Sequence, residues 1–135
     1  MGNPSDEVVK KIFETSKTVA VVGLSDKAHR SSYGVTEYLS KHYSIVGINP
    51  RLTEWNGFPC YPSLAEIPQD TKIDIVDVFR RSEFIPEIVD EVIALKPKLL
   101  WLQQGVVHDE AAAQVRQAGI EVVMDSCLAV VHSQL

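Results

Sequence analysis

The sequence predicts an α/β protein with a Rossmann-like, doubly wound parallel sheet of five or six strands and helices on both faces. Short apolar runs rich in β-branched residues alternate with amphipathic stretches along the whole chain. These runs are apolar throughout, as expected of strands that are covered on both faces. The 135 residues, 45% of them hydrophobic, suit one compact domain over residues 1–135.

The amino-terminal third predicts two helices and two strands. Ser5 is expected to cap a first helix that packs on the edge of the sheet through one apolar face made of Val8, Ile12 and Phe13. The apolar run over residues 18–23 is typical of a buried strand. A second helix is expected over residues 31–41, and a second strand over residues 43–49.

The middle of the chain begins with a proline-rich connection. A brief strand is compatible with residues 58–61, and a short helical piece with residues 63–67. Residues 73–79 alternate apolar and acidic side chains, which predicts a strand. Ser82 and Glu83 are expected to cap the helix that follows it.

The last third predicts two more strands around one helix. Residues 98–102 form an apolar run typical of a buried strand. The alanine-rich stretch 109–118 predicts a helix that Gly119 ends in a left-handed conformation. A final short strand is expected over residues 121–125.

Polar and cationic residues follow the predicted strands. Ser25, Arg30 and Ser32 lie in the loop after the first strand, just before a helix start, where unpaired N–H groups favour an anion. The carboxyl ends of parallel strands share one edge of the sheet, which is where such folds bind ligands. The other ends at this edge are Asn49-Pro50-Arg51, Phe79-Arg80-Arg81 and Gln103-Gln104-Gly105.

The loop after the first strand lacks the fingerprint of an NAD site. Gly23 is followed by Leu24 and Ser25, so the three-glycine G-x-G-x-x-G spacing is missing. The second strand ends in Asn49-Pro50-Arg51 and offers no carboxylate for a ribose hydroxyl. A cation at that place suits an additional phosphate, which leaves coenzyme A and NADP as candidate ligands.

Composition and spacing exclude several other functions. The net charge of −5 disfavours nucleic acid as a partner. No segment resembles a signal peptide or a membrane span, so no membrane partner and a cytoplasmic location are expected. Cys60 and Cys127 have no disulfide pattern, and His132 beside Cys127 offers too few ligands for a metal. No catalytic nucleophile or acid–base pair is recognisable, which favours a protein that is not an enzyme.

The ordered motifs VVGLSDK, RSSYG, NPR, YPSL, DIVDVFRRSEF, WLQ and VVMD resemble the small stand-alone CoA-binding proteins. These proteins are similar in fold to the CoA-binding domain of the succinyl-CoA synthetase alpha subunit. The resemblance runs from about Ser5 to His132. It implies a Rossmann-like domain that binds coenzyme A or an acyl-CoA and has no established reaction of its own.

The resemblance also implies a set of ligand-binding positions. The pyrophosphate would lie near the loop after the first strand, and the adenosine and its phosphorylated ribose near the next two strand ends. The main chain of Val78 and Phe79 would line the adenosine side, and the pantetheine arm would lie near the fourth strand end. The positions, in chain order, are Gly23, Leu24, Ser25, Arg30, Ser32, Tyr33, Asn49, Pro50, Arg51, Val78, Phe79, Arg80, Gln103 and Gly105. The chain departs from the family's usual ending at Ser126 and Val131, where an arginine and a glutamate are expected.

Three functions remain open from the sequence. The first is a CoA-binding protein that acts as a sensor, carrier or regulator. The second is an NADP-dependent oxidoreductase or the remnant of one, which Arg51 allows and the missing fingerprint weakens. The third is the CoA-binding subunit of an acyl-CoA ligase that acts with a partner chain. A protein partner or a homo-oligomer is compatible with each of them.

Plainer structural roles are expected for four other side chains. Arg81 is expected to form surface ion pairs with neighbouring carboxylates, and Cys127 to be a small buried side chain. Trp55 and Trp101 are expected to pack in the core or in a loop instead of stacking on adenine.

Overall fold

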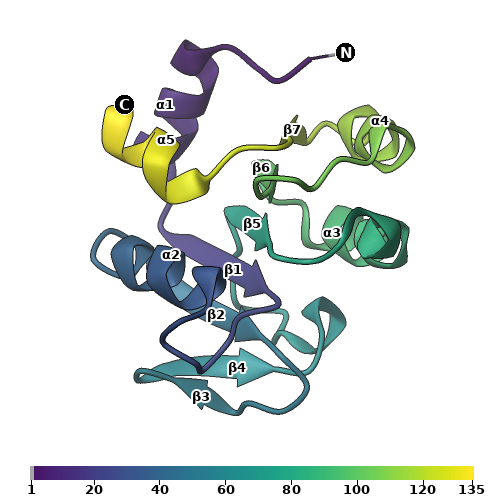
Figure 1. Ribbon diagram of the computed structural model, residues 1–135. Helices are drawn as coiled ribbons and strands as arrows, with labels where there is room; N and C mark the ends of the chain where they lie inside the picture. The colour runs from purple at the N-terminus through teal and green to yellow at the C-terminus, as the bar shows by residue number, and fades with distance from the viewer. Residues whose placement is uncertain (1) are drawn as a thin grey trace.

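The structure is a computed structural model that describes residues 2–135, and it contains one seven-stranded sheet with helices on both faces (Figure 1). The strands are β1 (Thr18–Val22), β2 (Ser44–Ile48), β3 (Glu54–Trp55), β4 (Phe58–Tyr61), β5 (Ile75–Val78), β6 (Leu99–Leu102) and β7 (Glu121–Val123). The helices are α1 (Asp6–Thr15), α2 (Ser31–Leu39), α3 (Val89–Leu95), α4 (Asp109–Gln117) and α5 (Leu128–Gln134), with 3₁₀ helices η1 (Leu64–Glu66) and η2 (Ser82–Ile88).

The strand order is β3-β4-β2-β1-β5-β6-β7, which confirms the doubly wound, Rossmann-like fold class. From β1 the chain first runs outward through β2 and β4, and then crosses to the other side of β1 to add β5, β6 and β7. The predicted number of five or six strands is too low. The extra strand is the two-residue β3, which pairs antiparallel with β4 and is too short to leave a pattern in the sequence.

Two apolar clusters explain why the strands are apolar throughout. Val19 and Val21 of β1 face the cluster under α1, α2 and α5, whereas Ala20 and Val22 face the cluster on the other side, with η1, η2, α3 and α4. Side chains alternate between the two faces of a strand, so a strand covered on both faces is apolar at most positions; the buried Asp77 of β5 is an exception. The helices therefore bury both faces of the sheet.

Helix α1 differs from its prediction in position and in buried face. The predicted cap is confirmed, since Ser5 Oγ accepts a hydrogen bond from the amide of Val8 at 3.4 Å. Val9 and Phe13 are buried, however, while Val8 is 39% exposed. The helix lies beside α5 over the sheet face (Figure 1), and the Phe13 ring lies 6.0 Å from that of Trp101. The elements that pack against α1 therefore bury the face that carries Val9 and Phe13 and leave Val8 outside it.

Two further elements differ from the sequence prediction. Ser82 does not cap the helix after β5: it begins the 3₁₀ helix η2, and its Oγ accepts a hydrogen bond from the amide of Val107. Pro86 lies inside η2 and has no amide proton for an α-helical hydrogen bond, so the regular helix α3 starts only at Val89. The carboxyl-terminal residues form α5, for which the sequence analysis predicts no element.

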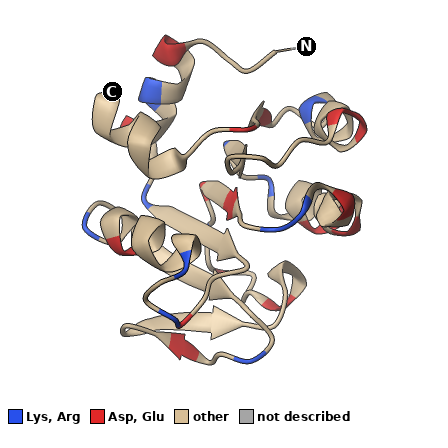
Figure 2. Cartoon of the chain, in the orientation of Figure 1, with Lys and Arg blue, Asp and Glu red and all other residues tan. Residues whose placement is uncertain are grey.

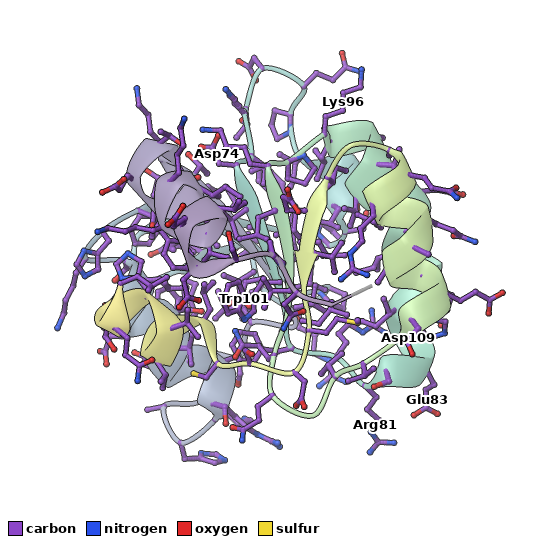
Figure 3. All side chains as sticks on the ribbon, turned by 90° about the horizontal axis from the view of Figure 1, so that it is seen from above. Asp74, Arg81, Glu83, Lys96, Trp101 and Asp109 are labelled. Carbon is purple, nitrogen blue, oxygen red and sulfur yellow. The ribbon has the colours of Figure 1, made fainter. Side chains whose placement is uncertain are left out.

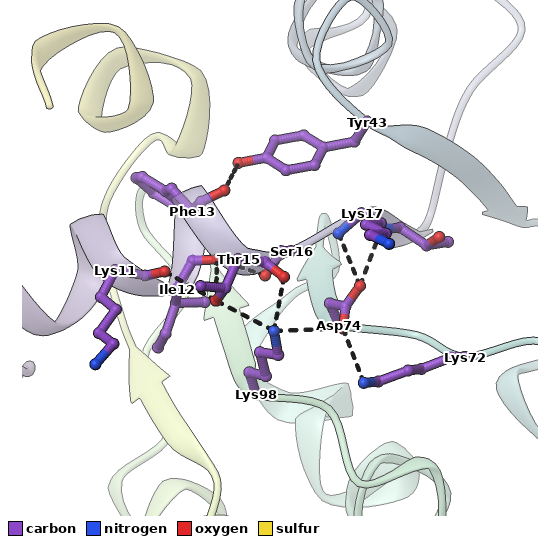
Figure 4. Close-up of polar contacts among 11 residues, drawn as sticks. Lys11, Ile12, Phe13, Thr15, Ser16, Lys17, Tyr43, Lys72, Asp74 and Lys98 are labelled. Atoms are coloured by element: carbon purple, nitrogen blue, oxygen red, sulfur yellow. Dashed lines mark hydrogen bonds and ion pairs between the residues drawn. The ribbon is translucent and has the colours of Figure 1, made fainter.

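Asp74 joins three strands at the edge of the sheet where they begin (Figure 4). Its Oδ2 accepts hydrogen bonds from the amides of Lys17 and Thr18, at 2.8 and 3.1 Å. Its Oδ1 lies 3.8 Å from Lys98 Nζ and 4.0 Å from Lys72 Nζ. The buried carboxylate thus links the start of β1 to the segments before β5 and β6, and this edge of the sheet is structural.

Candidate functional site

The carboxyl ends of four central strands lie in one row, joined by backbone hydrogen bonds. The amide of Gly23 donates to Ile48 O at 3.0 Å, and the amide of Phe79 donates to Val22 O at 2.9 Å. The amide of Gln103 donates to Val78 O at 3.3 Å. The chain reverses its direction of growth between β1 and β5, so the loops after these two strands leave a crevice between them.

Gly23 and the backbone of Phe79 approach each other closely at this crevice. Gly23 has a φ of +83°, and a Cβ atom at this position would lie 2.6 Å from Phe79 O. That oxygen belongs to the backbone and cannot move aside alone. Glycine is therefore required here both by the conformation and by the close approach of two strand ends.

Replacing Gly23 with alanine is expected to lower the free energy of unfolding by about 2–4 kcal/mol, because a left-handed conformation and a backbone clash coincide. Urea unfolding followed by circular dichroism measures the loss. Gly57→Ala is the matched control, since Gly57 has a φ of +88° and no atom within 4 Å of a built Cβ. That control should lose only about 1 kcal/mol. Equal losses in the two variants would contradict the role of the close approach.

The loop between β1 and α2 is held by its own hydrogen bonds. Ser32 Oγ accepts from the amide of Ser25 at 3.0 Å, and Ser25 Oγ accepts from the amide of Lys27 at 3.0 Å. Trp55 Nε1 donates to Ser25 O at 3.1 Å, which ties the loop to β3. No side chain caps the start of α2 at Arg30. The helix start therefore presents uncapped amides beside the ordered loop, an arrangement that suits an anion.

Asn49 connects the ends of β1 and β2. Its Nδ2 donates to Leu24 O at 2.8 Å, and its Oδ1 accepts from the amide of Arg51 at 2.7 Å. The short polar side chain thus forms a turn that directs the chain after β2 along the edge of the sheet. This turn brings Arg51 to the same side as the loop after β1.

Three adjoining hollows follow this edge, with volumes of about 560, 870 and 380 Å³. The first hollow lies between the loop after β1 and the end of β2, and it is lined by Gly23, Ser25, Asp26, Lys27, Arg30, Ser31, Ser32, Asn49, Arg51, Leu52 and Phe79. The second hollow lies between α2 and the ends of β5 and β6, and it is lined by Ser31, Gly34, Val35, Phe79, Arg80, Arg81, Gln103, Gln104, Gly105, Val106 and Cys127. The third hollow lies between the ends of β2 and β5, and it is lined by Val22, Gly23, Ile48, Asn49, Pro50, Pro62, Phe79, Arg80, Arg81 and Phe84. Phe79 borders all three, so they form one continuous concave edge.

Four arginines around this edge have no carboxylate partner. Within residues 2–135 the ion pairs involve Lys72 and Lys98 with Asp74, and none involves the arginines at positions 30, 51, 80 and 81. The Arg80 guanidinium lies 5.2 Å from the centre of the Phe84 ring. Figure 2 shows cations in the loop before α2 and in the segment after β5, and Figure 3 shows Arg81 at the end of the molecule opposite Asp74. The edge is thus locally cationic in a chain with a net charge of −5.

Eleven of the fourteen positions named from the sequence line at least one hollow. The other three do not. The side chains of Leu24 and Val78 are buried in the apolar clusters on opposite sides of the sheet. Tyr33 turns toward β3, where its hydroxyl accepts a hydrogen bond from Asn56 Nδ2 and its ring packs edge-on against Trp55. Successive residues of a helix point in different directions, so Tyr33 can face β3 while its neighbour Ser32 lines the first hollow.

Two residues near the site differ from their expected roles. Arg81 forms no ion pair among the described residues and lines the second and third hollows instead. Cys127 is half-buried and lines the second hollow. No sequence pattern predicts this place for Cys127, because it depends on how the segment before α5 packs. Trp55 and Trp101 are buried, as expected, and each indole N–H donates to a backbone carbonyl.

Helix α5 begins directly after Cys127, which lines the second hollow, and the helix is attached to α2 by a polar contact. Tyr38 Oη and His132 Nδ1 lie 2.8 Å apart, and the His132 ring lies 4.7 Å from that of His42. Burial, followed by the neighbouring His42, lowers the pKa of His132. The imidazole is thus neutral over a wider pH range, which suits its hydrogen bond with the tyrosine.

A buried carboxyl lies beneath the second hollow. Asp77 of β5 is 0% exposed, and its Oδ1 accepts a hydrogen bond from Gln103 Nε2 at 2.5 Å. Burial raises the pKa of Asp77 to about 7, although the hydrogen bond from Gln103 opposes the rise. A carboxyl group that changes charge near neutral pH therefore lies directly behind a residue that lines the site.

Residues 2–135 lack two features that other kinds of protein have. No group of three or more His, Cys, Asp or Glu side chains is arranged to hold a metal ion. Among the same residues, no helix has both the length and the apolar character needed to cross a membrane.

The strand order, the crevice between β1 and β5 and the concave cationic edge define a Rossmann-like α/β protein of the kind that binds nucleotides at its strand ends. The family model described as "CoA binding domain" matches residues 17–133. The chain belongs to this family.

Relatives of similar length and a more distant, longer enzyme support this assignment. The chain is 41% identical over 134 residues to the uncharacterized protein YneT of Bacillus subtilis, covering 98% of each. A solved structure from Thermus thermophilus is 34% identical, has a TM-score of 0.91, and is matched over 97% of this chain and 98% of that one. The chain is also 25% identical over 130 residues to an ADP-forming acetate–CoA ligase of Archaeoglobus fulgidus, where the match covers 88% of this chain and only 19% of the ligase.

Proposed function

We propose that the protein binds coenzyme A along the three hollows, without catalysing a reaction of its own. The observation that carries this proposal is the set of four arginines without carboxylate partners beside an uncapped helix start. A diphosphate and a ribose phosphate bring several negative charges to a small volume. Charge-assisted hydrogen bonds from arginine and from helix amides are the interactions that recognise such groups.

The chemistry of each hollow suggests how the ligand lies. The first hollow combines the start of α2 with Ser25, Arg30 and Ser32 and suits the pyrophosphate. Arg51, across the same hollow, suits the ribose 3′-phosphate. Asp26 is the one carboxylate among the residues that line this hollow, and its repulsion of an anion acts against the attraction from Arg30 and Arg51.

The other two hollows suit the less charged parts of coenzyme A. The third hollow presents Pro50, Pro62 and the Phe84 ring, which offer apolar surface to an adenine. The second hollow is lined by Gly34 and Gly105, which lack side chains, and by apolar side chains such as Val106. An extended, mostly apolar pantetheine arm suits this space.

Titration with CoA, acetyl-CoA, NADP and NAD tests the proposal. A ligand present at a hundredfold excess over its dissociation constant stabilises a protein by about 2.7 kcal/mol, which is a readily measured thermal shift. We expect CoA or acetyl-CoA to raise the melting temperature and NADP and NAD to leave it unchanged. A shift with NADP and none with CoA would favour the oxidoreductase-like function and overturn this proposal.

Two arginine variants are expected to separate the phosphates. Arg51→Ala should weaken CoA about tenfold and leave dephospho-CoA nearly unchanged, because only CoA carries the 3′-phosphate. Arg30→Ala should weaken both ligands by a similar factor, because both contain the pyrophosphate. Lys10→Ala, an exposed cation on α1, is the control and should affect neither. Calorimetry measures the dissociation constants, and equal losses for both ligands in Arg51→Ala would contradict the placement of the 3′-phosphate.

A second function is supported by the match to the acetate–CoA ligase. The chain corresponds to 19% of that enzyme's length, so a ligase built from separate chains would need a partner to supply the remainder. In this case the protein alone should bind CoA and should form no ATP from acetyl-CoA, ADP and phosphate. Formation of ATP by the purified chain would contradict both the non-catalytic function and the need for a partner.

A further inference from the structure

A carboxyl–amide pair lies behind the second hollow, at the ends of two neighbouring strands. Asp77 is the third residue of β5 and Gln103 is the first residue after β6, and they are 0% and 6% exposed. On β5, Ile75 and Asp77 point to the same face, the one that α1, α2 and α5 cover. Gln103 Nε2 donates to Asp77 Oδ1 at 2.5 Å, so the amide is held by a residue that solvent does not reach.

This hydrogen bond fixes the direction of the Gln103 amide. In the structure the NH₂ end of the Gln103 amide faces Asp77. Above the pKa of Asp77, at pH 8 and higher where binding is to be measured, the carboxylate accepts hydrogen bonds and cannot donate them, so only this direction of the amide gives a hydrogen bond. The oxygen Oε1 then points away from Asp77. Within residues 2–135 Oε1 has no hydrogen-bond partner. It is not fully buried, in contrast to the unpaired atoms Thr36 Oγ1 and Asp77 Oδ2. Since Gln103 lines the second hollow, Oε1 is the polar atom that it offers there.

We infer that Asp77 is a positioning residue that holds Gln103 as a fixed hydrogen-bond acceptor, and that the second hollow thereby selects a ligand arm carrying an N–H donor. The inference rests on the proposed function, in which that arm is pantetheine with its two secondary amides. Around Gln103 the hollow is largely apolar, with Val35 and Val106 among its lining residues. An N–H group of the ligand that met no acceptor there would remain desolvated and unpaired.

The pair also has a purely structural explanation, in which Gln103 does no more than satisfy a buried carboxyl. The two explanations differ in what a variant changes. A structural pair affects stability, and it affects all ligands of the site alike. A positioned acceptor affects only ligands that reach the second hollow, so the ratio of two dissociation constants separates the explanations.

The test compares CoA with adenosine 3′,5′-bisphosphate, which shares its phosphorylated nucleoside and lacks pantetheine. Gln103→Leu should weaken CoA about five- to tenfold and leave adenosine 3′,5′-bisphosphate unchanged, both measured by calorimetry. Gln104→Leu is the matched control: the exposed neighbour lines the same hollow without a buried partner, and its loss should stay below about twofold. An equal loss of CoA affinity in Gln103→Leu and Gln104→Leu would mean that any polar side chain in this hollow contributes alike. That result would overturn the inference.

Variants of Asp77 provide a second test, which does not require the Gln103→Leu variant to fold. In Asp77→Asn the new amide can pair with either end of Gln103, so the acceptor is fixed for only part of the time. Asp77→Leu offers no partner at all. The CoA to bisphosphate selectivity should therefore fall in the order wild type, Asp77→Asn, Asp77→Leu. Selectivity unchanged in Asp77→Asn and in Gln103→Leu would overturn the inference, as would a loss for both ligands alike.

The same measurements distinguish failure of the inference from failure of the proposed function. If the wild-type protein binds neither ligand, the proposed function is wrong and the inference is overturned with it. If the wild type binds CoA and adenosine 3′,5′-bisphosphate, and Gln103→Leu changes neither dissociation constant, the proposed CoA binding is retained. The proposed role of the Asp77–Gln103 pair is then overturned.

Discussion

Trp101→Ala is expected to lower the free energy of unfolding by about 3–5 kcal/mol, one of the largest losses available to a single substitution in this protein. The side chain is 1% exposed on β6, which pairs with β5 and β7, and Figure 3 shows it near the centre of the molecule. It packs against Phe13 of α1 and donates through Nε1 to Ser126 O at 2.8 Å. Alanine would leave a cavity between the sheet and two helices.

Trp101→Phe provides the control for this prediction. Phenylalanine keeps most of the apolar volume and removes the N–H donor to Ser126 O, so the loss should be about 1–2 kcal/mol. Urea unfolding followed by far-ultraviolet circular dichroism gives both values without relying on tryptophan fluorescence. A loss below about 1 kcal/mol in Trp101→Ala would contradict the packing described for this face.

Trp101→Ala is also expected to disturb the second hollow more than the first. Ser126 precedes Cys127, which lines the second hollow, and α5 follows at Leu128. The loop after β1 is held instead by its hydrogen bonds with Ser32 and Trp55. At temperatures where the variant remains folded, CoA should therefore lose more affinity than adenosine 3′,5′-bisphosphate.

Asp77→Asn is expected to remove a large part of the pH dependence of stability between about pH 4 and pH 7. Burial raises the pKa of Asp77 from its usual 3.8 to about 7. Between these values the unfolded chain has lost this proton and the folded protein keeps it, so raising the pH favours unfolding. At about 1.36 kcal/mol for each pKa unit, the stability that is lost across the interval is at most about 4 kcal/mol.

The sign of this effect is specific to a carboxyl with a raised pKa. The contribution of Asp77 is complete below its unfolded pKa, falls as the pH rises, and is constant above its folded pKa. His132 acts in the opposite direction, because its lowered pKa adds stability as the pH rises toward its ordinary value. His132 is present in both proteins, so the difference between wild type and variant isolates Asp77.

Urea unfolding at pH 5, 6, 7 and 8 measures this prediction. The stability of Asp77→Asn relative to wild type should increase with each step up to about pH 7 and then level off. Asp90→Asn, an exposed aspartate on α3, is the control and should follow the wild-type profile. A constant difference between Asp77→Asn and wild type across this range would contradict the raised pKa.

The sequence predicted the order and type of most elements because their signals are local. A buried parallel strand is apolar at most positions, and residues 19–22 and Leu99–Leu102 follow this pattern. The left-handed end of α4 at Gly119, with a φ of +87°, follows from the glycine itself. Elements without such a signal were missed: β3 has two residues, and α5 gains its stability from packing on Phe13 and Trp101.

Most of the candidate site was also predictable, because parallel strands bring their carboxyl ends to one edge. Any polar residue just after a buried strand is therefore near that edge, which is how Ser25, Asn49 and Gln103 were found. The direction of each side chain was not predictable. Tyr33 turns away from the site and Arg81 toward it, and both outcomes depend on how the helix or loop leaves the sheet.

Local patterns in the amino-acid sequence thus determined the fold class, the glycine at the tight strand end and the cations placed after the strands. The tertiary structure alone decided that Val9 and Phe13, instead of Val8, face the core, that Cys127 reaches the second hollow, and that Asp77 is buried against Gln103. The physical reason is that backbone conformation and strand periodicity are encoded within a few residues. Which side chains meet, and which charges lose their water, depends on segments that approach one another only after the sheet has formed.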